Sequence, residues 1–277
     1  MNLANHLDLL ATAPDGVKRL RGLILELAVR GKLVPQDPAD EPASELLKRI
    51  EAEKARLVKE GRIRKPKAVE AVGEDERPFG LPAGWEWCRF ESITLSRLGK
   101  MLDAAKNRGA LRPYLRNTNV QWFIFDLSDI KQMRLADDEL EEYRVEPGDL
   151  LICEGGEPGR CAIWQGEAEE MYFQKALHRV RPLCGVLAQY LAMLLRQDAV
   201  SGALAEYFTG ATIKHFPGDK LQKYRVPLPP LPEQHRIVAK VHELMALCDR
   251  LQADLATARD HRARLADTLV QVALEAA

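Results

Sequence analysis

The chain has 277 residues, a length that corresponds to about two domains. Its 40 basic residues nearly balance its 41 acidic residues, which excludes a uniformly basic coat for nucleic acid and leaves polyanion binding to local patches. No stretch reaches the ~20 apolar residues of a membrane helix, and residues 1–14 lack a signal-peptide pattern. Five cysteines without a CxxC pair argue against a disulfide framework or a zinc finger. We expect a reduced, cytoplasmic, globular protein with no membrane contact.

Motifs of common enzyme classes do not occur in the sequence. There is no GxxxxGK[ST] loop, no HExxH, no GxSxG and no GxGxxG after a strand. The glycine-rich run at residues 155–160 fits a tight turn between strands better than a nucleotide site. His178 and His215 lack further metal ligands at a suitable spacing. We therefore predict no catalytic residue, no metal and no cofactor of the chain's own.

Two helices are predicted in the first region, residues 1–80. Apolar residues recur at helical spacing over residues 17–28, Gly31 fits the end of that helix, and prolines then prevent its continuation. A second helix is expected over residues 44–58. The basic residues at 62–67 begin a linker, which is either a solvated tether or a phosphate contact.

The middle region, residues 81–228, is predicted to be one globular, mixed α/β domain of the α+β class. A helix is expected from about Val186 to Leu204. Short apolar or alternating runs predict strands at residues 85–90, 120–125, 150–153, 171–177 and 224–226.

The last region, residues 229–277, predicts a long coiled-coil helix. Its apolar residues alternate at spacings of four and three. A helix of ~40 residues is ~60 Å long, so it needs a partner helix from the first region or from another chain. The residues predicted for a dimer or partner interface are Ile237, Val241, Leu244, Cys248, Leu251, Leu255, Leu265 and Leu269.

Four ordered segments carry a resemblance to a known family. They are LELAVRGKLVPQ at residues 25–36, LPAGWEW at 81–87, GDLL through GEPGR at 148–160, and PPLPEQHRIV at 229–238. In these segments the chain resembles the DNA-specificity (S) subunits of Type I restriction-modification systems. The resemblance implies globular target-recognition domains on a long antiparallel coiled-coil spacer. It also implies modification subunits as partners, which methylate adenine at N6 with S-adenosylmethionine, and a restriction subunit as a further candidate.

Such subunits usually have two recognition domains, whereas this chain has one. It therefore resembles a half-length form, which can rebuild the full architecture as a homodimer.

Charge is separated along the chain. Residues 100–116 hold five basic residues against one acidic residue, a net charge of +4, and residues 171–181 hold three basic residues and no acid. Residues 137–157 hold nine acids against one base, a net charge of −8, and should face away from DNA or meet a partner. The predicted phosphate contacts are Lys106, Arg108, Arg112, Arg116, Lys175 and Arg179.

Two segments are candidates for base contacts. In an extended strand, Asn117, Asn119 and Gln121 would share one face, and such amides pair with the N6/N7 edge of adenine. The alternative is that they satisfy backbone groups in a loop. Thr212 and Lys214 lie in a second candidate loop, whose alternative is an ordinary turn.

The sequence thus predicts a non-catalytic, sequence-specific subunit that binds double-stranded DNA and directs an adenine-N6 methyltransferase to a bipartite target, as a homodimer. S-adenosylmethionine is expected only in the modification subunit. The competing hypothesis is a structural or regulatory coiled-coil partner that does not read DNA. A stand-alone nuclease or methyltransferase lacks its motif, because residues 228–231 read LPPL where an adenine methyltransferase needs a polar first residue and an aromatic last one.

Overall fold

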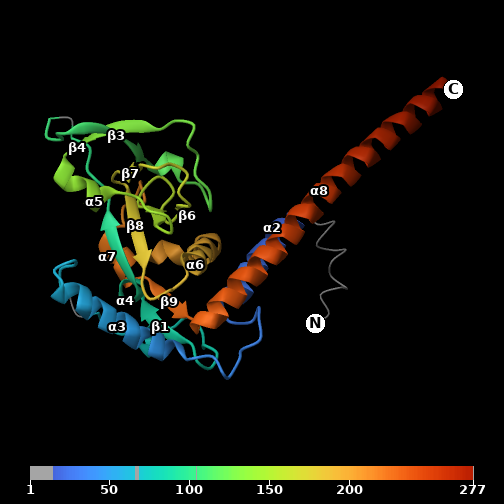
Figure 1. The fold of residues 1–277 in the computed structure, drawn as a ribbon. Helices are drawn as coiled ribbons and strands as arrows, with labels where there is room; N and C mark the ends of the chain where they lie inside the picture. Colours follow the sequence, from blue (N-terminus) through green and yellow to red (C-terminus); the bar gives the residue numbers. More distant parts are fainter. Residues whose placement is uncertain (1–14, 66–68, 104, 277) are drawn as a thin grey trace.

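The structure is a computed structural model that describes residues 15–65, 69–103 and 105–276. Residues 66–68 of the predicted basic linker lie outside these ranges. A mixed α/β body carries one long helix, α8 (Leu231–Glu275), which projects far beyond it (Figure 1). None of the described helices combines the length and the apolar character needed to cross a membrane.

The two predicted N-terminal helices are confirmed as α2 (Gly16–Val29) and α3 (Ala43–Lys59). Gly31 follows α2 with a φ of 64°. A Cβ at Gly31 would lie 2.5 Å from the Pro82 ring, so both the turn and the close packing require glycine.

Three small sheets contain the described strands of the body. The first pairs the two ends of the body, β1 (Glu86–Arg89) and β9 (Arg225–Leu228), in antiparallel register. The second has the antiparallel order β2 (Thr94–Leu98), β8 (Leu177–Pro182), β5 (Leu150–Cys153) and β6 (Cys161–Ile163). The third has the order β4 (Lys131–Leu135), β3 (Ala110–Leu115) and β7 (Tyr172–Phe173), with β3 and β7 parallel.

Shorter helices and 3₁₀ turns connect these strands. The helices are α4 (Phe90–Ile93), α5 (Leu140–Tyr143), α6 (Ala188–Ser201) and α7 (Gly218–Lys223). The 3₁₀ turns are η1 (Glu74–Glu76), η2 (Asn117–Asn119), η3 (Asp137–Glu139) and η4 (Ala203–Tyr207).

Most predicted strands are confirmed, but the strand expected over residues 120–125 is wrong. This segment is a tight loop closed by a single bridge between Val120 and Phe125. Phe123 has a φ of 68°, and its N–H donates to the carbonyl of Cys161 at 2.9 Å. A backbone in the left-handed region cannot continue a strand. Strands β2, β3 and β4 and most of β8 were not predicted, because polar residues interrupt their apolar pattern. Strand β6 was not predicted because its three residues are too few to show a pattern.

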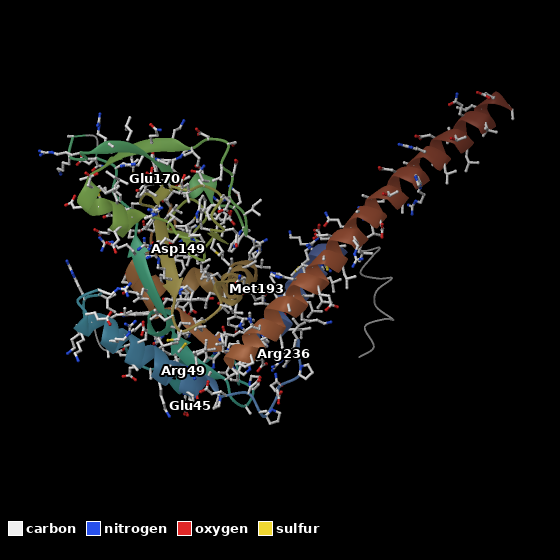
Figure 2. The ribbon with its side chains drawn as sticks, viewed as in Figure 1. Glu45, Arg49, Asp149, Glu170, Met193 and Arg236 are labelled. Carbon is white, nitrogen blue, oxygen red and sulfur yellow. The ribbon has the colours of Figure 1, made fainter. Side chains whose placement is uncertain are left out.

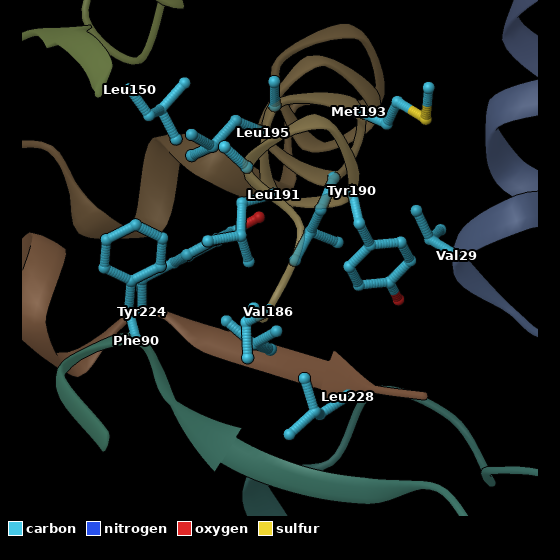
Figure 3. Packing of buried hydrophobic residues seen from close by; sticks show 14 of the residues in the cluster. Val29, Phe90, Leu150, Val186, Tyr190, Leu191, Met193, Leu195, Tyr224 and Leu228 are labelled. Atoms are coloured by element: carbon cyan, nitrogen blue, oxygen red, sulfur yellow. The ribbon is translucent and has the colours of Figure 1, made fainter. Parts of the chain in front are cut away.

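One hydrophobic core joins the body to both helical regions. Leu191 and Leu195 of α6 point toward Leu150 and the Tyr224 ring, and Val29 of α2 lies on the other side, next to Tyr190 (Figure 3). The same buried cluster includes residues of α3 and α8. Residues of all three regions predicted from the sequence therefore share this cluster, and two smaller clusters lie within the middle region.

The first half of α8 packs against α2, which runs antiparallel to it (Figure 1). Arg21 pairs with Asp249 at 2.6 Å, whereas Gln36, beyond the other end of α2, donates to Glu233 at 3.1 Å. Ile237, Val241 and Cys248 are buried by this packing, and Leu244 is partly buried. Of the two partner helices that the sequence left open, the first region of the same chain is therefore the one that covers these four residues, and another chain is not.

The second half of α8 lies beyond the end of α2. Leu251 and Leu255 are partly exposed, whereas the side chains of Leu265 and Leu269 are 64% and 69% exposed. The helix has 45 residues, about 68 Å of length, and α2 has 14. The length difference leaves the second half without a covering helix among the described residues.

Asp198 of α6 is a largely buried carboxylate. The pKa of Asp198 is raised from 3.8 to about 6, mainly by burial and further by the nearby Glu206. The hydrogen bond from the Tyr224 hydroxyl and the charge of Arg225 act in the opposite direction and lower the pKa. The folded chain thus holds this proton more tightly than the unfolded chain. The resulting stabilisation is fully present below about pH 3.8 and is lost as the pH rises through 6.

We expect Asp198→Asn to remove this pH dependence. Asparagine can still accept the bond from Tyr224, at 2.6 Å in the structure, but it does not titrate. Between about pH 3.5 and 7, the wild type should lose about 3 kcal/mol of unfolding free energy relative to the variant. Urea unfolding at several pH values measures this difference. Asp254→Asn on the exposed face of α8 is the control, and parallel curves for wild type and Asp198→Asn would contradict the assignment.

Candidate nucleic-acid interface

Four loops meet at one end of the body. They are residues 116–125, 154–160, 174–176 and 209–215, which we call the loop surface. Backbone hydrogen bonds join them: Glu154 N–H donates to Ala176 O at 2.9 Å, and Phe216 N–H donates to Glu154 O at 2.7 Å. The Asn117 amide donates to Gly155 O at 3.2 Å. Segments nearly 100 residues apart in the sequence therefore form one continuous surface.

Exposed positive charge lies on this surface. Lys175 and Lys214 come from two different loops, both are exposed, and His215 is exposed beside Lys214. Within the part of the chain that the structure describes, neither lysine forms an ion pair. Thr212 is also exposed on the second of these loops, as predicted. The two lysines are free to contact phosphate groups of a polyanion.

Lys106 and Arg108 are exposed as well, but they lie away from the loop surface. Lys106 lies 3.3 Å from Asp103, in a pair that solvent screens because the lysine side chain is 85% exposed. Lys106 and Arg108 come just before β3, beside Gly109, whose carbonyl accepts a hydrogen bond from Arg134 at 2.9 Å. The loop surface begins at the other end of β3, a strand of six residues, or about 20 Å. At about 3.4 Å per base pair, roughly six base pairs span this distance, so one duplex can contact both groups.

Arg179 does not face solvent, so its predicted phosphate contact is wrong. It lies in the centre of β8 and is 9% exposed. Its guanidinium donates to the Arg144 carbonyl and stacks over the Phe173 ring at 5.4 Å. Burial lowers the pKa of Arg179 to about 10. Strand β8 is paired on both sides, with β2 and β5, and the Arg179 side chain points into the interior. Arg179 therefore supports the fold and does not contact DNA.

Arg112 and Arg116 are half-buried and already paired. Arg112 lies 2.9 Å from Glu170, and Arg116 lies 2.8 Å from Asp129. Both arginines were predicted to contact phosphate, but these carboxylates neutralise their charge. Figure 2 shows Glu170 near β3 at the far end of the body.

The three amides do not form a base-reading edge, because the segment is not extended. Residues 117–119 form the 3₁₀ turn η2, and Asn119 is 3% exposed. Its oxygen accepts from the Arg116 N–H at 2.9 Å, and its nitrogen donates to the Asp126 carbonyl at 2.9 Å. Gln121 donates to the Thr118 carbonyl at 3.0 Å. The alternative interpretation, amides that satisfy backbone groups in a loop, is therefore the correct one.

Exposed apolar side chains at the loop tips were missed by sequence reasoning. Phe123 and Ile124 are 47% and 64% exposed, and Ile213 is 68% exposed. Trp122 beside them is fixed, because its indole N–H donates to Glu157 at 2.7 Å and Arg196 lies over its ring at 4.7 Å. The run of apolar residues at 120–125 predicts a strand and gives no sign of these exposed tips. In a DNA interface, such tips contact thymine methyl groups or wedge between base steps.

Part of the acidic segment pairs with cations of the body, whereas Asp137, Asp138 and Glu141 are exposed. Asp149 is 2% exposed and accepts two hydrogen bonds from Arg181, at 2.7 and 3.1 Å (Figure 2 labels Asp149). Glu139 pairs with Lys100, and Glu142 pairs with Arg97. Part of the excess acid of residues 137–157 therefore holds strands and helices together.

Comparison with known proteins identifies the family. The family model of the Type I restriction modification DNA specificity domain matches residues 82–257. The chain belongs to this family. The match runs from the residues before β1 through the first half of α8, and it includes all four loops of the loop surface.

Two curated relatives agree with this assignment, and a solved structure shares the fold. The EcoAI specificity subunit of Escherichia coli is 37% identical over 92% of this chain and 44% of the relative. The EcoEI specificity subunit of the same organism is 30% identical over 98% of this chain and 48% of the relative. The chain thus spans about half the length of these relatives. A structure described as the basis of assembly and conformational transition of the type I R-M system shares the fold, with a TM-score of 0.51, 20% identity, and coverage of 90% of this chain and 54% of that one.

Three of the four segments that resemble the specificity family meet at the base of the body, far from the loop surface. Trp85 donates its indole N–H to Glu233 at 2.8 Å, and Gln36 donates to the other oxygen of Glu233. Gln234 is fully buried and accepts from the Leu187 N–H at 3.0 Å. These residues close the domain where α8 leaves it. Their role in this specificity-family chain is to fix the arm to the body.

The remaining segment forms the turn between β5 and β6, as predicted. Gly156 has a φ of 81°, and a Cβ there would lie 2.7 Å from the Asn117 amide nitrogen. A Cβ at Gly155 would lie 3.3 Å from His215 Nδ1. The glycines thus let three loops of the specificity domain approach each other closely.

Proposed function

We propose that this chain reads duplex DNA as the recognition part of a Type I specificity subunit. The observation that carries this proposal is the loop surface, where four loops bring together unpaired cations and exposed apolar tips. Lys175 and Lys214 supply salt-dependent attraction to phosphates. Phe123, Ile124 and Ile213 supply contacts with base edges or base steps in a groove.

The chain itself recognises the DNA sequence and does not catalyse the reaction. In this proposal it directs a modification subunit that methylates adenine at N6, and that subunit alone binds S-adenosylmethionine. A restriction subunit is a third candidate partner. The names of the relatives support this division, because they are called specificity subunits of Type I restriction enzymes.

A bipartite target requires two recognition domains at a fixed separation. We propose that two copies of the chain supply them, with the exposed second half of α8 as the contact between copies. Leu265, Leu269 and Val272 lie on one side of that helix and are 64%, 69% and 57% exposed. A two-fold axis would relate the two domains and make the two half-sites identical.

Selection from a library of random duplexes with the purified chain tests both parts of the proposal. We expect enrichment of a palindromic motif in two parts, separated by a fixed gap. Long-read sequencing of DNA from a methylation-free host that co-expresses a matching modification subunit should then place N6-methyladenine in the same motif. An asymmetric motif would indicate a second, different recognition domain. No enrichment in either experiment would contradict DNA reading.

We expect Leu265→Lys/Leu269→Lys to convert the dimer into a monomer, because two buried leucines at a helix seam would become charged. Mass photometry or sedimentation measures the change. Ala263→Lys/Gln271→Lys adds the same charge on the opposite side of the helix and should leave the dimer intact. Equal masses for all three proteins would contradict this interface.

A further inference from the structure

A pocket of about 250 Å³ lies where the helical arm meets the body. Its walls come from the end of α2, the residues before β1, the end of α6, the turn η4 and strand β9. None of its lining residues belongs to the loop surface. The pocket is therefore a separate feature of the molecule. Figure 3 shows Val29 of α2 facing Tyr190 of α6 in the core beside it.

The cations that line the pocket are already engaged. Arg30 lies 3.3 Å from Glu26 and stacks over the Phe79 ring at 5.3 Å. Arg225 pairs with Glu206 and donates to the Glu76 carbonyl. Within each pair, the charge of the arginine cancels the charge of the glutamate. The remaining carboxylate of the pocket therefore has no cation to balance its charge.

That carboxylate is Asp198. It accepts a hydrogen bond from the Tyr224 hydroxyl at 2.6 Å, and it forms no ion pair with any residue that the structure describes. Burial beside Glu206 makes the charged form costly, so a cation in the pocket would relieve that cost.

A second acceptor lies next to it in the sequence. Gln197 lines the pocket and is 9% exposed, and its Oε1 is buried without a hydrogen-bond partner among the described residues. Buried amides in native proteins are rarely left unpaired, and an orphaned acceptor needs an explanation such as a missing ligand. Asp198 and Gln197 therefore each contribute an acceptor oxygen to the lining of the pocket.

The walls and the size limit what can enter. Phe79 and Trp87 pack edge to face with their centroids 5.0 Å apart, and Tyr207 lines the pocket on another side. Flat cations stack on such rings, as Arg30 does over Phe79 at 5.3 Å and Arg225 does over Tyr207 at 5.7 Å. Of the three rings, Trp87 carries no such cation from the described residues. Sites for drug-sized ligands have about 300–1,000 Å³, so this pocket suits one side chain and not a nucleotide.

We propose that this pocket binds the guanidinium group of an arginine side chain presented by a partner protein. Guanidinium has five N–H donors and no acceptor, and its planar fork can bridge a carboxylate and an amide oxygen while stacking on an aromatic ring. An ammonium is a point charge and matches this arrangement less well. Arginines that fill pockets are frequent anchors of protein interfaces. Ser201, Ala203 and Glu206 at the rim are exposed, which leaves the pocket open to such a partner.

NMR titration of the full chain tests this proposal, with the Trp87 indole as reporter and Trp87→Phe to assign its signal. The probes are N-acetyl-arginine methylamide, the corresponding lysine and citrulline amides, and free arginine. We expect saturable binding of the arginine amide on the order of millimolar, as for a single anchored side chain. The lysine amide should bind at least tenfold more weakly, and the neutral citrulline amide should not bind.

Variants locate the site. Gln197→Leu and Asp198→Asn should each weaken arginine amide binding about tenfold or more, whereas Glu45→Gln on α3, outside the pocket, should not change it. Thermal unfolding checks that each variant is folded, and the two pocket variants provide independent tests. Equal binding of arginine and citrulline amides, or unchanged binding in both pocket variants, would overturn the proposal. Free arginine binding tenfold more tightly than the amide would also overturn it, because the site would then select a free amino acid.

Discussion

Replacing Lys106, Arg108, Lys175 and Lys214 with glutamine should lower the affinity for duplex DNA about a thousandfold near 0.15 M salt. Each phosphate contact contributes about 0.9 to the slope of log K against log salt, so four lost contacts reduce that slope by about 3.6. Replacing only Lys175 and Lys214 with glutamine should lower the affinity about 30-fold. Fluorescence anisotropy with a labelled duplex, repeated at several salt concentrations, measures both quantities.

Four exposed cations of the helical arm provide the matched control: Lys18, Arg19, Arg250 and Arg259. Their replacement changes the net charge equally but leaves the loop surface intact, so affinity should fall by less than about tenfold. Equal losses in both variants would mean that only overall charge matters. If the Lys175/Lys214 double variant lost as much affinity as the fourfold variant, Lys106 and Arg108, at the far end of β3, would not belong to the interface.

Replacing Asp149 with alanine should cost about 3–5 kcal/mol of unfolding free energy. Asp149 is 2% exposed, accepts two bonds from Arg181, and accepts a third from the Glu146 N–H at 2.8 Å. The substitution leaves the buried Arg179, 3.9 Å from Asp149, without a counter-charge, and Arg181 keeps only the exposed Glu146. Breaking a buried pair in this way costs several kcal/mol. Domains are stable by only about 5–15 kcal/mol, so the loss is a large fraction of the total. Urea unfolding measures it.

Glu146 offers a control with the same partner. It lies 2.9 Å from Arg181, but its side chain is 52% exposed, so solvent screens the interaction. Glu146→Ala should therefore cost less than about 1 kcal/mol. Similar costs for the two variants would show that burial does not set the strength of the Asp149 pair.

The helices were predicted correctly because their signals are local. The apolar residues of α2 and α8 repeat with the helical period, and Gly31 ends the first arm at a backbone angle that only glycine adopts easily. The turn at residues 155–160 and strand β5 follow from similar short-range patterns.

The candidate site was predicted less well, because exposure depends on distant residues. Arg179 looked like a phosphate contact beside other basic residues, but the Arg144 carbonyl and the Phe173 ring enclose it. Asn119 looked like a base reader, but the turn at η2 directs it to the Asp126 carbonyl. Neither sequence distance nor residue type reveals such partners, since strand pairing and loop closure bring them together.

The sequence alone determined the family, the mixed α/β class, the two helical arms and the separation of charge, because periodicity, glycine and proline positions and motif letters are properties of neighbouring residues. Only the tertiary structure decided which charged side chains face solvent and which part of α8 is covered by α2. It buried Ile237 and Cys248 under α2, left Leu265 exposed, and placed Lys175 and Lys214 on one surface. The physical reason is that burial and ion pairing are set by contacts between segments far apart in the chain, which a one-dimensional pattern does not specify.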